Sequence, residues 1–188
     1  MVSKVPESDA QATPDEELVR ACAAGDRGAF DTLVARHQRQ VYLLCYRLVG
    51  NHEDASELAQ DAFVRAYRGL GRFRGAARFT TWLHRISVNV CLNRLDSKRP
   101  VHEPLAEIER VPGCGEAADA AILRLERAAR VRAAISRLPK KQRATPILRA
   151  YHDLPHDEIA RVLGSSVGAV KANFFHALGN LKKLLAEE

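Results

Sequence analysis

The sequence has no apolar run long enough to cross a membrane, and its N-terminus lacks the apolar core of a signal peptide. Its four cysteines stand far apart, without the CxxC or Cys/His spacing of a zinc site or the pattern of a disulfide framework. The seven histidines are scattered, and neither clustered carboxylates with metal spacing nor a nucleophile–base pair is present. These absences argue against a membrane protein, a metalloprotein and an enzyme such as a nuclease. We expect a cytoplasmic, non-enzymatic protein with no metal and no cofactor.

Charge is unevenly distributed along the 188 residues. The formal net charge is +6, with 29 Lys and Arg against 23 Asp and Glu. Residues 1–31 and 100–121 each carry −4, whereas residues 32–99 and 122–188 each carry +7. Two basic blocks separated by an acidic one are typical of two modules that bind one polyanion. Basic helix surfaces in an arginine-rich chain would give the same totals, so charge alone leaves nucleic-acid binding open.

Apolar residues recur at intervals of three and four almost throughout, and no strand-like alternation is present. The sequence therefore predicts an all-α protein. Between residues 100 and 118 the pattern breaks into prolines, glycines and glutamates, which indicates a flexible acidic linker between two small helical domains. We expect a disordered tail over residues 1–14, a first domain over 15–99 and a second domain over 119–188.

Helix ends carry recognisable signals. Asp26 and Asn51 are expected to cap the helices that follow them, and Gly50 to end a helix in the left-handed conformation. Pro14 is expected at the first helical position, in a capping box that opens on Thr13. Pro146 should kink or shorten its helix because it lacks the backbone N–H.

Basic residues are most concentrated between residues 65 and 99, where only Asp96 is acidic. Three glycines within residues 69–75 predict a loop, which we expect to expose Phe73 between two arginines. Arginines for phosphates and aromatic faces for bases are the composition of a single-strand-binding surface. Phe79 and Trp82, three residues apart, are expected to be ordinary core residues.

Residues 157–178 carry the most specific local pattern. Apolar residues pack a first helix, Gly164 supplies a turn, and Ser166 caps a second helix anchored by Val170 and Phe174. This pattern is typical of a helix-turn-helix, whose second helix enters the DNA major groove. Any amphipathic helical hairpin is the alternative.

From about residue 15 to 185 the chain resembles an extracytoplasmic-function (ECF) sigma factor of the sigma-70 superfamily, a two-domain subunit of bacterial RNA polymerase. EDASELAQDAFVRAYR, at 53–68, is similar to the family's region-two helix, D-A-E-D-L-V-Q-E-x-F-x-x-A-Y. RFRGAARFTTWLHRISVNVCLNRLDSKR, at 72–99, is similar to R-F-R-G-x-x-x-F-x-T-W-L-x-x-I-A-x-N. Residues 138–151 and 154–171 resemble region four. The resemblance implies a four-helix region 2 at residues 15–99 and a helix-turn-helix region 4 at residues 119–188.

The resemblance also assigns a partner to each surface. An acidic-polar face would dock on the β and β′ subunits of core polymerase, although it could simply be a solvated face. Its residues are Asp54, Glu57, Gln60 and Asp61. A second set would hold the single-stranded −10 element, by base capture and phosphate contacts, as Arg94 also would. These residues are Arg65, Arg68, Arg72, Phe73, Arg74, Arg78, Arg85, Asn89 and Asn93.

The second helix of the helix-turn-helix would read the duplex −35 element. The candidates are Ser166, Lys171, Asn173, Phe175 and His176. The family pattern K-S-R-x-x-R-A-R is here KANFFHAL, so two or three arginines are missing and a weaker, less salt-dependent grip on phosphates is expected. Phe175 would contact thymine methyl groups or would pack.

The implied function is promoter-directed transcription initiation with melting that uses binding free energy alone, since no ATP-binding motif is present. An anti-sigma partner is also implied. The linker would either thread toward the polymerase active-site cleft or serve as a tether. The alternative function is an autonomous helix-turn-helix regulator, which would need neither the acidic-polar face nor the aromatic loop.

Overall fold

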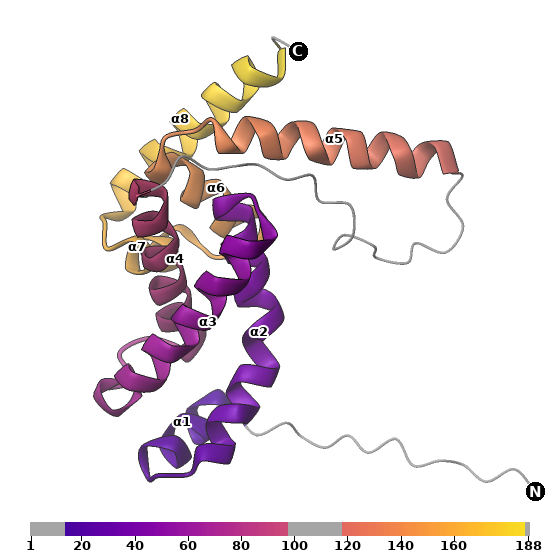
Figure 1. The fold of residues 1–188 in the computed structure, drawn as a ribbon. Helices are drawn as coiled ribbons and strands as arrows, with labels where there is room; N and C mark the ends of the chain where they lie inside the picture. The colour runs from indigo at the N-terminus through magenta and orange to yellow at the C-terminus, as the bar shows by residue number, and fades with distance from the viewer. Residues whose placement is uncertain (1–13, 98–117, 187–188) are drawn as a thin grey trace, which may run out of the picture.

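The computed structural model describes residues 14–97 and 118–186, and within these ranges every regular element is a helix, as predicted. None of the helices in these ranges is long and apolar enough to span a bilayer. Figure 1 shows the arrangement. The elements are α1 (Asp15–Ala23), α2 (Arg27–Val49), α3 (His52–Gly69), the short 3₁₀ helix η1 (Leu70–Arg72), α4 (Phe79–Ser97), α5 (Ala118–Ser136), α6 (Lys140–Tyr151), α7 (His156–Leu163) and α8 (Val167–Ala186).

Helices α2, α3 and α4 pack against one another and form the first module, with α1 packed on α2. Their apolar stripes meet in a core whose largest members, including Leu33, Leu44 and Leu83, have at most 1% of their surface exposed. Asp15 holds α1 in place, because its carboxylate accepts hydrogen bonds from Arg36 Nη1 at 2.5 Å and His37 Nε2 at 2.7 Å, both on α2.

The helix ends confirm most of the local signals. The Asp26 carboxylate accepts the Ala29 N–H at 3.3 Å, and the Asn51 side-chain oxygen accepts the Asp54 N–H at 2.7 Å. Gly50 ends α2 with a φ of 87°, a left-handed conformation that favours glycine.

The expected place of Pro14 and the expected shortening of a helix at Pro146 were both wrong. Pro14 precedes the first helical residue instead of occupying it, and Thr13 lies outside the described residues. Helix α6 continues through Pro146, although the Gln142 carbonyl thereby loses its helical donor. Ala144, Ile147 and Leu148 flank this proline with no exposed surface. Burial of that apolar face stabilises the helix by more than one missing hydrogen bond costs.

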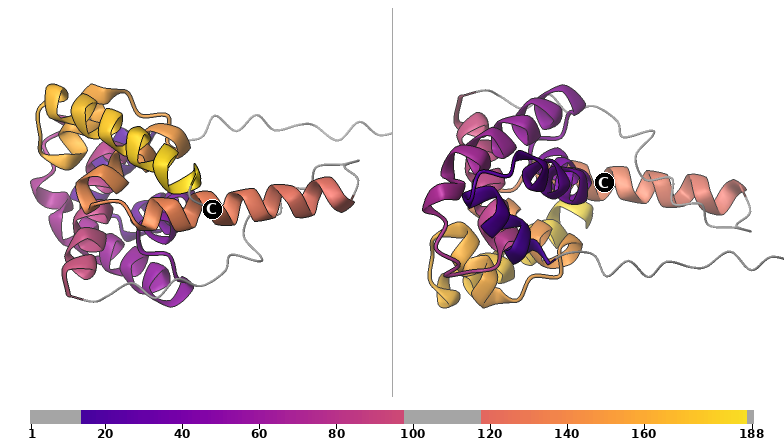
Figure 2. Two further views of the ribbon diagram at one scale, coloured as in Figure 1. Left: turned by 90° about the horizontal axis from the view of Figure 1, so that it is seen from above. Right: turned by 90° about the horizontal axis from the view of Figure 1, so that it is seen from below.

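Helices α6, α7 and α8 form the second module, in which Ile159 of α7 and Val170 of α8 are fully buried. Gly164 makes the turn between α7 and α8 with a φ of 58°. Helix α5 meets the module near its own C-terminus and projects away from it, as both views of Figure 2 show. Of the expected tail over residues 1–14 only Pro14 is described, and the expected linker over 100–118 lies outside the described residues except for Ala118, where α5 already begins.

The two modules lie directly against each other. Helix α4 packs on α6 and α7, and α2 packs on α5 and α6. The Thr81 hydroxyl donates to Glu158 at 3.1 Å, the Arg47 guanidinium lies 3.9 Å above the Tyr151 ring, and Lys140 pairs with Asp96. The charge pattern predicted two modules but not this contact between them.

Arg143 of α6 lies at the centre of this contact and is only 5% exposed. It donates to the Leu48 carbonyl at 3.0 Å, to the Leu138 carbonyl at 3.4 Å and to the Ser136 carbonyl. Leu48 and Ser136 stand in the last turns of α2 and α5, where carbonyls lack helical donors and the helix dipole is negative. Burial lowers the pKa of the guanidinium, but an arginine stays charged at neutral pH. The buried cation is therefore balanced by helix ends.

We predict that Arg143→Ala lowers the free energy of unfolding by about 2–3 kcal/mol, because buried carbonyls lose a charged donor. Arg149→Ala is the matched control, since Arg149 donates to the Leu154 carbonyl at an exposed site, and should cost less than about 1 kcal/mol. Urea denaturation followed by circular dichroism measures both. Equal losses would show that Arg143 has no special role.

Candidate nucleic-acid and protein interfaces

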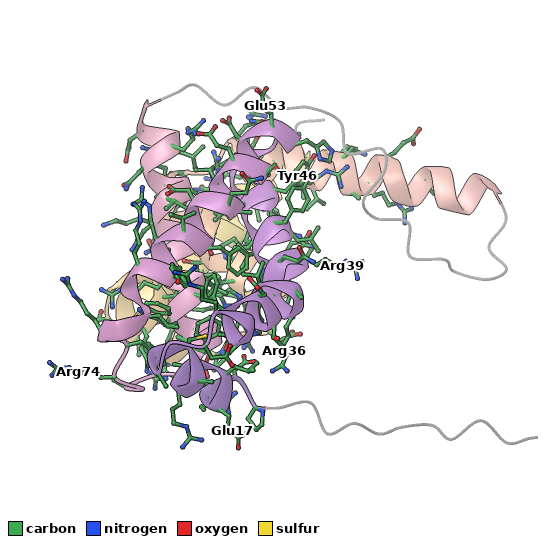
Figure 3. The ribbon with its side chains drawn as sticks, turned by 60° about the horizontal axis from the view of Figure 1, so that its bottom comes forward. Glu17, Arg36, Arg39, Tyr46, Glu53 and Arg74 are labelled. Carbon is green, nitrogen blue, oxygen red and sulfur yellow. The ribbon has the colours of Figure 1, made fainter. Side chains whose placement is uncertain are left out.

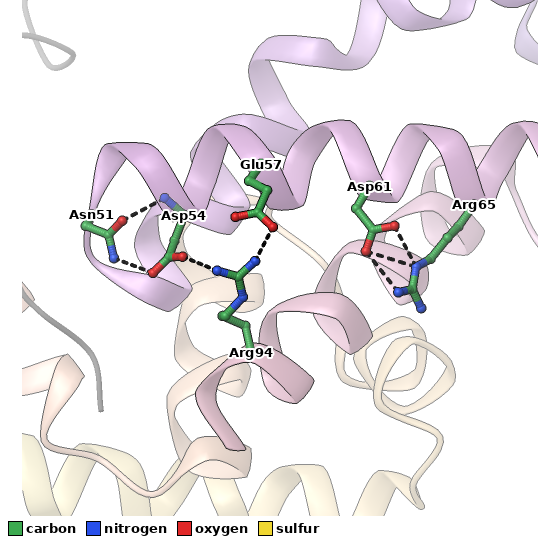
Figure 4. A network of polar contacts seen from close by, with 6 residues as sticks. All are labelled: Asn51, Asp54, Glu57, Asp61, Arg65 and Arg94. Carbon is green, nitrogen blue, oxygen red and sulfur yellow. Dashed lines mark hydrogen bonds and ion pairs between the residues drawn. The ribbon is translucent and has the colours of Figure 1, made fainter. Parts of the chain in front are cut away.

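Carboxylates of the acidic-polar face on α3 are engaged within the chain (Figure 4). Arg94 of α4 pairs with Asp54, and its other terminal nitrogen lies 2.5 Å from the Glu57 carboxylate. Arg94 and Asp54 have side chains only 16% and 19% exposed, whereas the Glu57 side chain is 62% exposed. The hydrogen bond to Glu57 raises the pKa of Arg94 above its usual value. The resemblance implied phosphate binding for Arg94, but its guanidinium is occupied by these two carboxylates.

Asp61 and Arg65 form a second pair on α3, one helical turn apart, with 2.9 Å between Arg65 Nη2 and Asp61 Oδ2. The hydrogen bond that Arg65 donates to the Asp61 carboxylate raises the pKa of Arg65. The resemblance assigned these two residues to different partners. The pair is exposed, so competition from polymerase or phosphate requires little energy, because such pairs contribute only about 0.3–0.5 kcal/mol.

Gln60 lies apart from the three carboxylates, on the side of α3 that faces α2. It lines a groove of about 420 Å³ between the two helices. Arg39 and Tyr42 of α2 and Phe63 of α3 line the same groove, and Figure 3 shows Arg39 at the edge of the molecule. The structure therefore divides the predicted face in two. Periodicity within α3 could not reveal the groove, since half of it belongs to α2.

Most of the predicted −10 residues lie at the surface. Arg85, Asn89 and Asn93 are exposed and recur every four residues, so they form one stripe along α4. Arg74 reaches out at one end of the module in Figure 3. The exposed side chains of this set are Arg65, Arg68, Arg72, Arg74, Arg78, Arg85, Asn89 and Asn93.

Phe73 is not exposed as expected, but is partly buried. Its ring lies 4.9 Å from the Trp82 ring and 6.3 Å, edge-on, from the Phe79 ring. The backbone permits this because η1 turns the chain back, and a Cβ on Gly69 would stand 3.1 Å from the Trp82 ring. Phe79 is in the core as predicted, whereas Trp82 is only partly buried. The result is a three-ring cluster below the exposed arginines.

The recognition helix α8 presents its candidates unevenly. Ser166 caps it as predicted, accepting the Ala169 N–H at 3.1 Å. Lys171 and His176 are exposed, and Phe175 is 75% exposed, which excludes packing as its role in this structure. Asn173 is half-buried at the edge of the face that packs on α6 and α7.

Residues assigned to two different DNA elements share one cleft. It has a volume of about 780 Å³ and lies between the modules. The first module contributes Arg72, Phe73, Arg74, Trp82 and Arg85. The second contributes Arg161, Ser165, Ser166 and Val167 at the turn of the helix-turn-helix.

Two family models match the chain. Sigma-70 region 2 matches residues 33–100, and Sigma-70 region 4 matches residues 128–181. The RNA polymerase sigma-H factor of Pseudomonas aeruginosa is 36% identical over 180 residues, covering 91% of this chain and 93% of the relative. The ECF RNA polymerase sigma factor SigM of Mycobacterium tuberculosis is 40% identical over 172 residues, covering 91% and 84%. SigW of Bacillus subtilis, also an ECF sigma factor, is 31% identical and covers 92% and 97%.

Solved structures agree with this result. The structure of CnrH in complex with the cytosolic domain of CnrY is similar with a TM-score of 0.70 and 28% identity, covering 93% of this chain and 98% of that chain. The sigma factor RpoE of Bartonella quintana, in complex with the anti-sigma factor NepR, gives a TM-score of 0.66 at 17% identity, covering 84% and 96%, and supports the fold alone. Both regions, in order and on one chain, identify it: the chain belongs to the extracytoplasmic-function (ECF) family of RNA polymerase sigma factors.

Proposed function

We propose that the chain binds core RNA polymerase in the bacterial cytoplasm and directs it to promoters, reading the −35 and −10 elements without catalytic chemistry of its own. The observation that carries this function is the pairing of two surfaces on one chain. The first module presents a stripe of arginine and asparagine beside an aromatic cluster, and the second presents the exposed face of a capped recognition helix. An autonomous regulator would need only the second surface.

Glu57 is the first contact we propose for polymerase. Its side chain is 62% exposed while one oxygen is held by Arg94, so it can accept a second cation without leaving its present position. Asp54 is fixed between Asn51 and Arg94 and positions the guanidinium. Gln60 and the α2–α3 groove would extend this contact, with Asp61 at its border.

For the −10 element we propose base capture at the edge of the three-ring cluster. Unstacking one base costs a few kcal/mol, and stacking on an aromatic ring recovers about 1–3 kcal/mol per base. Phe73 would rotate from Trp82 toward the base, and Asn89 offers both a donor and an acceptor to its edge. The exposed arginines, with Asn93 on the same stripe, would hold the phosphates on either side.

For the −35 element we propose that Lys171 binds guanine or phosphate and that Phe175 contacts thymine methyl groups. Ser166 and the free N–H groups of the first turn of α8 suit a phosphate. His176 and Asn173 would complete the set, with Asn173 limited by its partial burial.

We also propose an anti-sigma partner. CnrH is in complex with the cytosolic domain of CnrY, and RpoE of Bartonella quintana is in complex with NepR. A partner of this kind would hold the chain away from polymerase until it is released. Transcription from a cognate promoter, found by selection with reconstituted holoenzyme, tests the function as a whole. Tight, specific binding to duplex promoter DNA without polymerase would contradict it.

We predict that Asn89→Ala and Phe73→Ala reduce open-complex formation at least tenfold while core binding changes less than twofold, since a lost base contact is worth about 1–3 kcal/mol. Permanganate footprinting measures melting, and fluorescence anisotropy measures core binding. Arg20→Ala, an exposed residue of α1, is the matched control. Equal loss of melting and core binding would indicate a folding defect instead.

We predict that Lys171→Ala and Phe175→Ala each alter only the −35 preference of the holoenzyme, by about 1–2 kcal/mol at single base pairs. Selection of promoter libraries followed by sequencing reads both elements at once. Lys182→Ala, exposed farther along the same helix, should leave both preferences unchanged. If the −35 sequences selected by Lys171→Ala were the same as those selected by the unmodified chain, Lys171 would not contact the −35 bases.

A further inference from the structure

The described structure cannot read a promoter in its present arrangement. Elements named −10 and −35 are about 25 base pairs apart, or about 85 Å along B-form DNA at 3.4 Å per step. Arg72 and Ser166, assigned to these two elements, line the same cleft of about 780 Å³, whose width is on the order of 10 Å. The modules must separate before both readers can bind. Residues 98–117 join the modules and could span at most about 70 Å.

Few polar contacts hold the modules together. Thr81 bonds to Glu158, Lys140 pairs with Asp96, Arg47 covers Tyr151, and Arg143 donates to the Leu48 carbonyl. Opening would break these contacts and expose the sides of α2 and α4 that pack on the second module. It would leave Arg143 its Ser136 and Leu138 acceptors, since these belong to the second module. A closed and an open state can therefore share the same two folded modules.

Two histidines meet across the contact. His84 of α4 and His152 at the end of α6 lie with ring centroids 4.8 Å apart and planes at 69°. His84 Nδ1 and His152 Nε2 are buried and have no hydrogen-bond partner within the described residues. Burial is the main cause that lowers the pKa of His84 to about 4 and that of His152 to about 3. Both rings are neutral in the closed state, and protonation would place two cations in contact.

The surrounding charges also disfavour the protonated forms of His84 and His152. His37 on α2 acts against a proton on His84, and Arg47 on α2 acts against one on His152. The nearby carboxylates have other partners, since Asp15 of α1 binds Arg36 and His37, and Glu158 of α7 accepts from Thr81. His156 of α7 packs on Phe174 within the second module. Within residues 14–97 and 118–186, neither ring of the pair therefore has an ion-pair partner for its charged form.

We propose that the free chain closes on itself, with the segment Arg72, Phe73 and Arg74 turned toward the helix-turn-helix, and that the His84–His152 contact makes this closure acid-sensitive. Closure would keep the proposed −10 and −35 residues from DNA, and this part of the proposal rests on the function proposed above. Closure itself does not depend on that function. In the free protein the second module of the same chain faces Arg72, Phe73 and Arg85 across the cleft and leaves too little room there for DNA.

The sign of the pH dependence follows from the two states. Each histidine has a lowered pKa when closed and an ordinary value near 6.5 when open. Their contribution to closure is therefore fully present above about pH 6.5 and is lost as the pH falls toward 4. Between pH 7.5 and 5.5 each histidine raises the opening equilibrium constant about tenfold, and the pair raises it about a hundredfold.

The experiment uses the free, full-length chain, without polymerase or DNA. Small-angle X-ray scattering measures the radius of gyration from pH 7.5 to 5.5, and the emission of Trp82, the single tryptophan, reports on the cleft. Far-UV circular dichroism confirms that the helices persist. We expect a compact particle at pH 7.5 that opens on acidification, about tenfold less steeply in His152→Gln and hardly at all in His84→Gln/His152→Gln. His176→Gln, which changes an exposed histidine outside the contact, should open like the unmodified chain.

A charge exchange tests closure at constant pH, in case the histidine variants misfold. Lys140→Glu should open the chain a few-fold at pH 7.5, and Asp96→Lys added to it should close the chain again. The pH series is repeated on Lys140→Glu. This variant has a larger open population at every pH, so a shift in the opening equilibrium can be measured even if the unmodified chain stays almost entirely closed. An extended particle at pH 7.5 would overturn closure. A pH profile that is flat, or identical in His152→Gln and the unmodified chain, would overturn the role of the histidines. Promoter selection tests the proposed function separately, so the two failures are distinguishable.

Discussion

The Arg143 guanidinium is the interaction on which the assembly of the modules depends. A buried cation is costly unless its surroundings supply compensating charge, and here three backbone carbonyls near the ends of α2 and α5 supply it. The carbonyls at these helix ends lack donors, and the buried guanidinium needs acceptors. The hydrogen bonds between them therefore offset the cost of burying both. The direction of α6 relative to α2 follows from this geometry, and with it the position of α7 against α4.

Ion pairing within the first module sorts its cations into two groups. Arg94 and Arg65 are engaged by carboxylates of α3, and Arg36 by Asp15. Arg72, Arg74 and Arg85 form no ion pair with a described carboxylate, and they surround the cleft and the stripe on α4. The positive potential that a phosphate would encounter at the cleft therefore comes from arginines outside these ion pairs. A charge count along the sequence gives the size of the basic block but not this division.

The features that could be predicted from the sequence are those that depend on interactions between residues close together in the chain. Caps at Asp26, Asn51 and Ser166 and the turn at Gly164 depend on a few neighbouring residues, and the structure confirms them. Contacts between distant segments were not predictable from periodicity. Arg143 finds a carbonyl 95 residues away, and Arg94 finds Asp54 40 residues away. Phe73 was predicted to be exposed because its loop is rich in glycine, but the Trp82 ring on another helix covers it. The residue roles at both DNA surfaces stay predictions.

The 75% exposed ring of Phe175 has a thermal consequence for an arginine-poor recognition helix. Burial of an apolar ring against a base pair carries a negative heat-capacity change, whereas a phosphate contact acts mainly through counterion release. Apolar association near room temperature is driven by solvent entropy and weakens on cooling. Under the −35 contact proposed for Phe175, a recognition helix with few arginines and an exposed phenylalanine would make promoter choice depend on temperature, with its poorest discrimination in the cold.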